Sequence, residues 1–116
     1  MSLIHTSARF GPIDPANLAA FKELAASLLE STQAEDGVLR YDWFFTEDGL
    51  WCEVREIYAD SDAVFVHVGN SADRLAEMNE LAGGLTLEVF GDPSPELRET
   101  LAAFGDVPIL PTFQSK

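Results

Sequence analysis

His67 is the residue of this sequence best suited to acid–base chemistry, because an imidazole side chain exchanges its proton near neutral pH. Glu56 and Tyr58 precede it on a predicted strand, where alternate residues point to the same face. Ala63 and His67 are four residues apart at the start of a predicted helix, so they share one face of that helix. A base, a carboxylate and a phenol are therefore expected to meet where this strand passes into this helix.

Each of these residues also has a structural interpretation. Glu56 can orient His67, or it can form an ion pair with Arg55 or with Arg40. Tyr58 can hydrogen-bond a ligand oxygen, although a tyrosine on an apolar strand is commonly a core residue. A histidine on a helix can equally be a structural hydrogen-bonding residue. The sequence alone leaves these alternatives open.

The elements that would position these residues follow from hydrophobic periodicity and from turn residues. The helix that carries His67 is expected to begin near Ser61 and to break at Gly69-Asn70, with a second segment at 73–82. The other expected elements are strands at 3–10, 37–45, 50–58 and 85–90 and a helix at 14–35 that starts at Asp14-Pro15. This βαββαβ order predicts a ferredoxin-like α+β fold.

Strands 37–45 and 50–58 are predicted to form a hairpin around a four-residue loop at 46–49. The expected register pairs Trp43 with Cys52. In this register one face of the hairpin holds Tyr41, Trp43, Glu56 and Tyr58. In any register, strand parity keeps Glu56 with Tyr58 and Tyr41 with Trp43. The opposite face carries charges that could pair diagonally, from Arg40, Asp42, Glu53 and Arg55.

Two short motifs resemble the antibiotic biosynthesis monooxygenase family. One is Glu-x-Tyr-x4-Ala-x3-His over residues 56–67, and the other is Gly-x-Leu-x-Tyr over residues 37–41. The resemblance covers about residues 3–91 in element order. It implies a ferredoxin-like chain that pairs with a second copy into a dimeric α/β barrel. It says less about chemistry, because such a family holds several activities.

The activity that this resemblance implies is oxygenation of a phenol or quinol without a cofactor. His67 would remove a proton from the substrate, assisted by Tyr58 and Glu56. A dry cavity lined by Tyr41, Trp43 and Phe65 would hold the anion while it reacts with O2. The alternative is a non-catalytic barrel that binds a small hydrophobic ligand between helix and sheet.

Other kinds of site find little support in the sequence. It contains no phosphate-binding glycine loop, no Gly-x-Ser-x-Gly elbow and no cysteine–histidine cluster. Asp60, Asp62 and His67 could bind a metal in principle, but the two aspartates already fit the start of a helix. Haem-degrading relatives carry a ligand histidine about ten residues after the position of His67, and residues 71–82 contain none. We therefore expect neither a cofactor nor a metal.

Residues 92–116 extend the predicted core of residues 1–91 within the same domain. Ser94 and Pro95 fit the start of a helix, whose apolar stripe would be Leu97, Leu101 and Phe104. The segment 107–113 contains two prolines, which restrict an extended chain to the edge of a sheet.

The composition limits the function classes. The chain has 116 residues, 47% of them hydrophobic, and a net charge of −13. That charge argues against nucleic acid and anionic membranes as partners. No apolar run approaches the length of a membrane span, and no secretion signal is visible. The single cysteine, Cys52, cannot form an internal disulfide and is expected to be a packed side chain. We therefore expect a cytoplasmic homodimer with a small aromatic substrate or ligand.

Overall fold

The computed structural model describes residues 3–116, so the first two residues of the predicted core 1–91 lie outside the described residues. The predicted α+β class is confirmed, and the ferredoxin-like βαββαβ order is followed by one further helix and a short strand. The elements are β1 (Ile4–Phe10), a 3-10 turn (Pro15–Asn17), α1 (Leu18–Thr32), β2 (Val38–Phe45), β3 (Cys52–Tyr58), α2 (Ser61–Ala82), β4 (Leu85–Phe90), α3 (Pro95–Ala103) and β5 (Ile109–Leu110).

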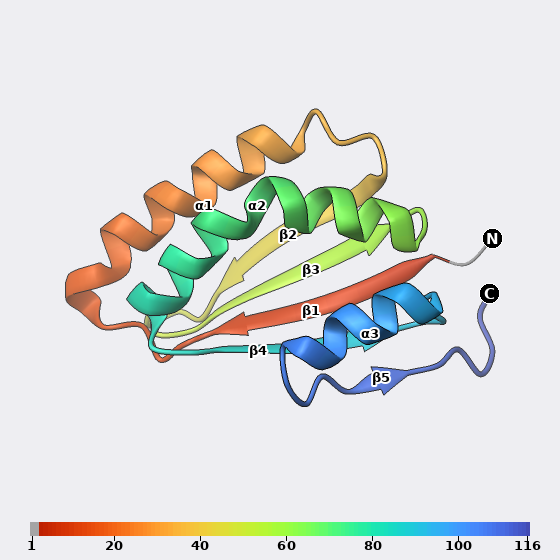
Figure 1. The fold of residues 1–116 in the computed structure, drawn as a ribbon. Coiled ribbons are helices and arrows are strands. Elements are labelled where there is room, and N and C mark those ends of the chain that lie inside the picture. The colour runs from red at the N-terminus through yellow and green to blue at the C-terminus, as the bar shows by residue number, and fades with distance from the viewer. Residues whose placement is uncertain (1–2) are drawn as a thin grey trace.

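The strands form one sheet in the order β2-β3-β1-β4-β5. The first four are antiparallel to their neighbours, and β5 is parallel to β4 at the edge. The helices lie on one side of this sheet, and its other face is left open (Figure 1). None of the helices within residues 3–116 is long and apolar enough to cross a membrane.

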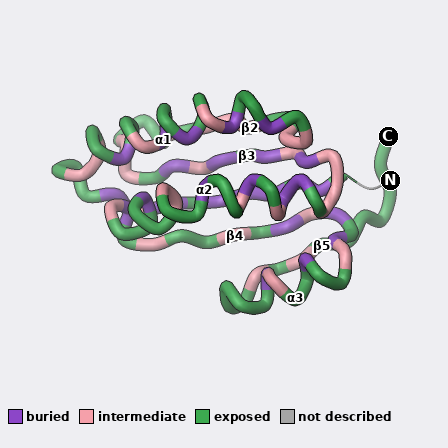
Figure 2. Tube along the Cα trace, turned by 45° about the horizontal axis from the view of Figure 1, so that its top comes forward, coloured by how far each residue is buried: buried purple, intermediate pink, exposed green. Residues whose placement is uncertain are grey.

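The core lies between the helices and the covered face of the sheet, where buried residues recur along the strands (Figure 2). One cluster includes Phe10, Phe21 and Val54 beneath α1 and α2. A second cluster joins β4 and α3 to the start of α2, and includes Val64 and Leu97. The extension therefore packs on the same side of the sheet as the other helices.

Local sequence signals explain where the helices begin and end. Asp14 accepts a hydrogen bond from the Ala16 backbone N–H, with Pro15 in the first helical position. Asp60 caps α2 through the Ala63 N–H, and Ser94 caps α3. Gly83 ends α2 with a φ of +76°, a conformation that glycine adopts without steric cost. The capping predictions are confirmed for α2 and α3, whereas Asp14 and Pro15 begin the 3-10 turn and α1 itself begins at Leu18.

The predicted break at Gly69-Asn70 is wrong, because α2 is continuous from Ser61 to Ala82. A glycine within a helix costs only about 1 kcal/mol relative to alanine. The helix is packed against the core both before and after Gly69 in the chain, since Val64 and His67 are buried and so are Ser71 and Met78. This packing offsets the cost of the glycine. Tertiary contacts therefore carry the helix through the weak position.

The predicted hairpin register and loop length are also wrong. Trp43 pairs with Val54 rather than with Cys52, and residues 46–51 form a six-residue loop. The Thr46 N–H donates to the Trp51 carbonyl and closes this longer loop. Because the register differs from the prediction by two residues, the two faces of the hairpin keep their predicted members.

In the extension, Leu97 and Leu101 are buried as predicted, whereas Phe104 is 63% exposed. Phe104 is the C-cap residue that follows α3. The predicted sheet-edge segment is confirmed for Ile109–Leu110 only, and Phe113 is 92% exposed. The Val89 N–H donates to the Pro108 carbonyl and the Gly91 N–H to the Leu110 carbonyl, which attaches β5 to β4.

Candidate active site

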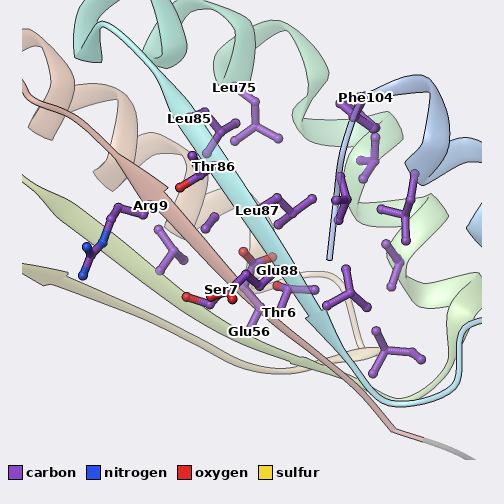
Figure 3. Close-up of a pocket in the computed structure, with 18 of the residues that line it drawn as sticks. Thr6, Ser7, Arg9, Glu56, Leu75, Leu85, Thr86, Leu87, Glu88 and Phe104 are labelled. Carbon is purple, nitrogen blue, oxygen red and sulfur yellow. The ribbon is translucent and has the colours of Figure 1, made fainter. Parts of the chain in front are cut away.

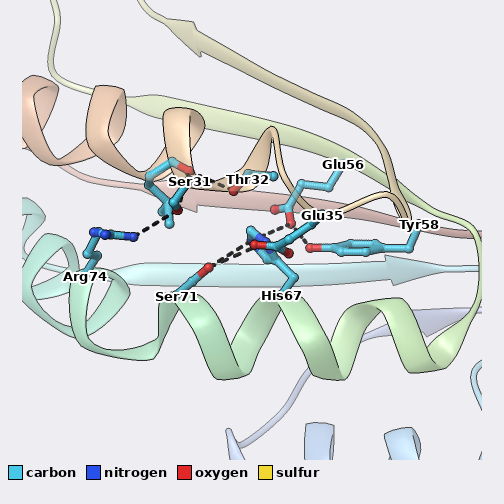
Figure 4. A network of polar contacts seen from close by, with 9 residues as sticks. Ser31, Thr32, Glu35, Glu56, Tyr58, His67, Ser71 and Arg74 are labelled. Atoms are coloured by element: carbon cyan, nitrogen blue, oxygen red, sulfur yellow. Dashed lines mark hydrogen bonds and ion pairs between the residues drawn. The ribbon is translucent and has the colours of Figure 1, made fainter.

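His67 lies on the buried side of α2, with only 3% of its surface exposed. Its Nδ1 is 3.1 Å from Oε1 of Glu35, which belongs to the turn between α1 and β2. Its Nε2 is 3.9 Å from Oε1 of Glu56 on β3, beyond hydrogen-bond distance. Figure 4 shows Glu35, Glu56 and Tyr58 converging on the imidazole. An imidazole between two carboxyl groups is an arrangement suited to proton transfer.

Glu56 and Tyr58 are side by side on the covered face of β3. The Tyr58 hydroxyl donates a hydrogen bond to Oε1 of Glu56, and both side chains are buried. The expected alternative, an ion pair between Glu56 and Arg55 or Arg40, is wrong. Both arginines belong to the open face, where Arg55 pairs with Glu53 and Arg40 pairs with Asp42.

Burial shifts the pKa values of two groups in this cluster. Removal from water raises the pKa of the Glu56 carboxyl, against the opposing effects of the Tyr58 hydrogen bond and of His67. Burial also raises the pKa of the Tyr58 phenol, and the neighbouring Glu56 raises it further. Both pKa shifts act in the direction of the neutral forms, the carboxylic acid and the phenol. Glu56 is suited to holding a proton that it could give to a reacting group.

Aromatic rings surround the imidazole on the sheet side. The Tyr41 ring centroid is 4.9 Å from that of His67, and the Tyr58 centroid is 5.7 Å from it. Trp43 packs edge to face on Tyr41 at 5.4 Å. Phe65 is two residues from His67 on the same helix and therefore points to a different side, where it packs on the cluster that includes Leu97.

A hollow region with a total volume of about 770 Å³ runs along both faces of β1 and β4, and the residues that line it include all six predicted site residues. Because alternate residues of a strand point to opposite faces of the sheet, the region has two parts, one on the covered face and one on the open face. On the covered side it passes from Glu56 under α2 to Phe104, while on the open side it touches Ser7 and Arg9 (Figure 3). The covered part has mostly apolar walls, and the only carboxyl groups on it within residues 3–116 are those of Glu56 and Asp106.

Buried polar atoms without a hydrogen-bond partner mark this wall. Among residues 3–116 they include the Thr6 hydroxyl oxygen and the Trp43 indole nitrogen, and both residues line the cavity. A buried donor or acceptor without a partner costs about 1–3 kcal/mol.

Two members of the cluster escaped the sequence analysis. Ser71 lies one helical turn after His67, with its hydroxyl 3.5 Å from both ring nitrogens, and this four-residue spacing was a usable signal. Glu35 had no such signal, because it is an acidic residue in a turn next to Asp36. Its burial is decided by how the turn folds back over the core.

The remaining candidates have structural roles. Asp60 is the N-cap of α2, as predicted. Within residues 3–116 no three His, Cys, Asp or Glu side chains are grouped as a metal site would require. Cys52 is buried in the core cluster, and burial raises the pKa of its thiol to about 12. A thiol in that state is an unreactive packing group.

The fold of this chain matches several solved structures, whereas its sequence finds no match. No protein-family model matches the sequence, and no characterised protein matches it by sequence alone. MupZ from Pseudomonas fluorescens is 26% identical and superposes with a TM-score of 0.78 over 99% of this chain and 93% of MupZ. Because almost the whole chain is matched, MupZ shares the extension at 92–116.

Two further structures match a smaller part of the chain. Rv0793 from Mycobacterium tuberculosis is 26% identical with a TM-score of 0.70, over 79% of this chain and 96% of its own. A candidate antibiotic biosynthesis monooxygenase from Caulobacter crescentus CB15 is 25% identical with a TM-score of 0.69, over 76% of this chain and 87% of its own. These two matches leave more than a fifth of the chain outside.

Proposed function

Because the chain has the fold of the antibiotic biosynthesis monooxygenase family, we propose that it is a monooxygenase that oxidises a small phenol or quinol with O2 and without a cofactor. The observation that carries this proposal is the buried imidazole of His67. It is hydrogen-bonded on one side to Glu35, and on its other side lies Glu56 in the cavity wall. Such a group can exchange a proton with a substrate held away from water.

In the proposed reaction His67 takes the proton of the substrate hydroxyl, which leaves an electron-rich phenolate. The phenolate carbon bonds to one atom of O2, and the O–O bond then breaks. The ring C–H becomes C=O, and the second oxygen leaves as water with the two protons that the substrate gave up. The substrate itself supplies all the electrons, so the balance of this reaction requires no other reductant.

The other site residues have roles that follow from their positions. Tyr41 and Trp43 form an aromatic wall beside His67, against which a planar substrate can stack. Glu56 lies next to Tyr58 with its pKa raised by burial, and in its protonated form it can give a proton to the developing peroxide. Phe65 lies on another part of the wall, where it would contact the distal end of the substrate.

We further propose that the protein is a homodimer that pairs through the open face of the sheet. The support is the apolar area left uncovered there, since Phe44 and Leu110 are about half exposed while Ile57 and Phe90 are only partly buried. Sedimentation equilibrium at micromolar concentration checks this proposal. A monomeric mass would contradict it.

A second candidate function is storage or sensing of a hydrophobic ligand without chemistry. The observation that favours it is the apolar wall of the covered cavity beyond Phe65, formed by the second core cluster. Oxygen uptake separates the two functions. A purified monooxygenase would consume O2 in proportion to the phenol or quinol added, whereas a binding protein would bind the same compounds with no O2 consumed.

A screen of quinols and of fused-ring phenols in an oxygen electrode is therefore the decisive experiment. The expected result is substrate-dependent O2 uptake by protein that has been dialysed against a chelator. If compounds that bind the protein give no uptake above the buffer rate, the monooxygenase proposal is wrong.

A further inference from the structure

Glu35 is held in place by its own backbone. Its N–H donates to the Thr32 carbonyl at 2.9 Å, and its carbonyl accepts from the Val38 N–H at 3.1 Å. These bonds close the turn after α1 and direct the side chain into the protein, where only 6% of it is exposed. A buried carboxyl group is costly unless its hydrogen bonds are made. Glu35 is therefore a fixed acceptor rather than a mobile surface acid.

The two nitrogens of His67 differ in their surroundings. Nδ1 has the Glu35 oxygen at 3.1 Å, whereas the carboxyl oxygen of Glu56 nearest to Nε2 is at 3.9 Å. The Ser71 hydroxyl is 3.5 Å from each nitrogen and does not distinguish them. The hydrogen bond made by one ring nitrogen decides which nitrogen carries the proton. The geometry therefore favours the proton on Nδ1.

His67 and Glu35 line different hollows. His67 and Glu56 line the large cavity. Glu35 instead lines a second, more open hollow of about 430 Å³ between the end of α1 and β2, together with Arg40 and Asp42. The second oxygen of Glu35, Oε2, is buried and has no partner among residues 3–116. Water that enters this rear hollow is a suitable partner for it.

We propose that Glu35 is a positioning residue, which holds His67 as the Nδ1–H tautomer and so leaves Nε2 as the basic atom on the cavity side. This inference rests on the proposed function, because it states which atom of the site accepts the substrate proton. As that proton arrives at Nε2, the Nδ1–H bond to Glu35 stabilises the positive charge on the ring. Glu35 itself does not touch the substrate.

The tautomer can be measured without a substrate. The chain has two histidines, so long-range ¹H–¹⁵N correlation spectra of the ¹⁵N-labelled protein contain two imidazole patterns. His5 is exposed on the open face and serves as the internal reference. At a pH where both rings are neutral, we expect the pattern of Nδ1–H for His67. A pattern of Nε2–H for His67 in the wild-type protein overturns the proposal.

The Glu35→Gln variant tests whether Glu35 holds His67 as the Nδ1–H tautomer. The amide of glutamine can donate as well as accept, so the ratio of Nδ1–H to Nε2–H should fall on the order of 10-fold. Asp36→Asn is the matched control, because it removes the same charge from the exposed neighbouring residue and should leave the ratio unchanged. An unchanged ratio in folded Glu35→Gln contradicts the proposal.

Kinetics separate this inference from the proposed function. With a substrate found by oxygen uptake, Glu35→Gln should lower kcat on the order of 10²-fold, leave KM nearly constant and alter the pH profile of kcat. A loss confined to KM would contradict the positioning role. If the protein shows the Nδ1–H tautomer and consumes no O2 with any compound, the tautomer assignment stands and the monooxygenase proposal fails.

Discussion

Glu53 and Glu56 are three residues apart on β3, and their carboxyl groups differ in almost every physical respect. Glu53 is on the open face of the sheet, where it accepts hydrogen bonds from Arg55 at 2.5 Å and Arg9 at 3.2 Å. The hydrogen bond from Arg55 and the charges of both arginines lower its pKa. Glu56 is on the covered face, where burial raises its pKa and Tyr58 is its hydrogen-bond donor.

The comparison shows that the side of the strand, rather than the residue type, decides what a carboxyl group can do. On the open face water screens the charges, and an exposed ion pair contributes about 0–1 kcal/mol. On the covered face the same group is removed from water and sits near an imidazole. Only the second environment yields a group whose proton is available to a substrate. The following changes test this contrast from the largest expected effect to the smallest.

The largest difference between the two faces is expected for the turnover of variants at the two histidines. His67→Gln keeps a donor for Glu35 but removes the base, so turnover of a confirmed substrate should fall about 10²–10⁴-fold. His5→Gln on the open face should leave turnover within about 2-fold of wild type. Steady-state O2 uptake measures both variants, and circular dichroism checks that they are folded. Full activity in folded His67→Gln would place the catalytic group elsewhere.

Loss of a hydrogen-bond donor should matter for stability on the covered face. Tyr58→Phe leaves the buried Glu56 without its hydroxyl donor, so the free energy of unfolding should fall by about 1–3 kcal/mol. Urea denaturation measures the loss. In a double-mutant cycle with Glu56→Gln, the two effects should be non-additive. Strict additivity would show that the Tyr58–Glu56 contact contributes nothing.

The two glutamates should give opposite pH dependences. Because the folded state raises the pKa of Glu56, it binds that proton more tightly than the unfolded chain, and this group's contribution to stability falls as the pH rises above about 4.5. Because the folded state lowers the pKa of Glu53, its contribution is present above about pH 4.5 and is lost as the pH falls.

Glu56→Gln should therefore gain stability relative to wild type between about pH 3 and about pH 7, and Glu53→Gln should lose it. Urea midpoints at one protein concentration give both differences, since a dimer's stability depends on concentration. If the stability difference from wild type changed with pH in the same direction for both variants, the conclusion that the two glutamates have opposite pKa shifts would be wrong.

The smallest effect is expected for Arg9→Ala. Arg9 is 57% exposed and shares Glu53 with Arg55, which remains in place. The free energy of unfolding should fall by no more than about 1 kcal/mol, and less at high salt. A loss of several kcal/mol would show that water does not screen this ion pair, and it would contradict the contrast between Glu53 and Glu56.

The sequence by itself determined the order of the elements, their caps and the faces of the strands. These features depend on residues close together in the chain, such as Asp60 with Ala63, or on the two-residue period of a strand. Parity kept Glu56 with Tyr58 and Tyr41 with Trp43. The predicted register was wrong by two residues, and because that shift is even, the two pairs still share one face.

Only the tertiary structure decided which groups meet His67. Glu35 is 32 residues away along the chain, and its side chain is buried because the turn after α1 folds over α2. The continuity of α2 through Gly69 and the cavity between α2 and the extension likewise depend on contacts between distant segments. Periodicity and turn signals are local, so they cannot report contacts whose energy arises only when these layers pack together.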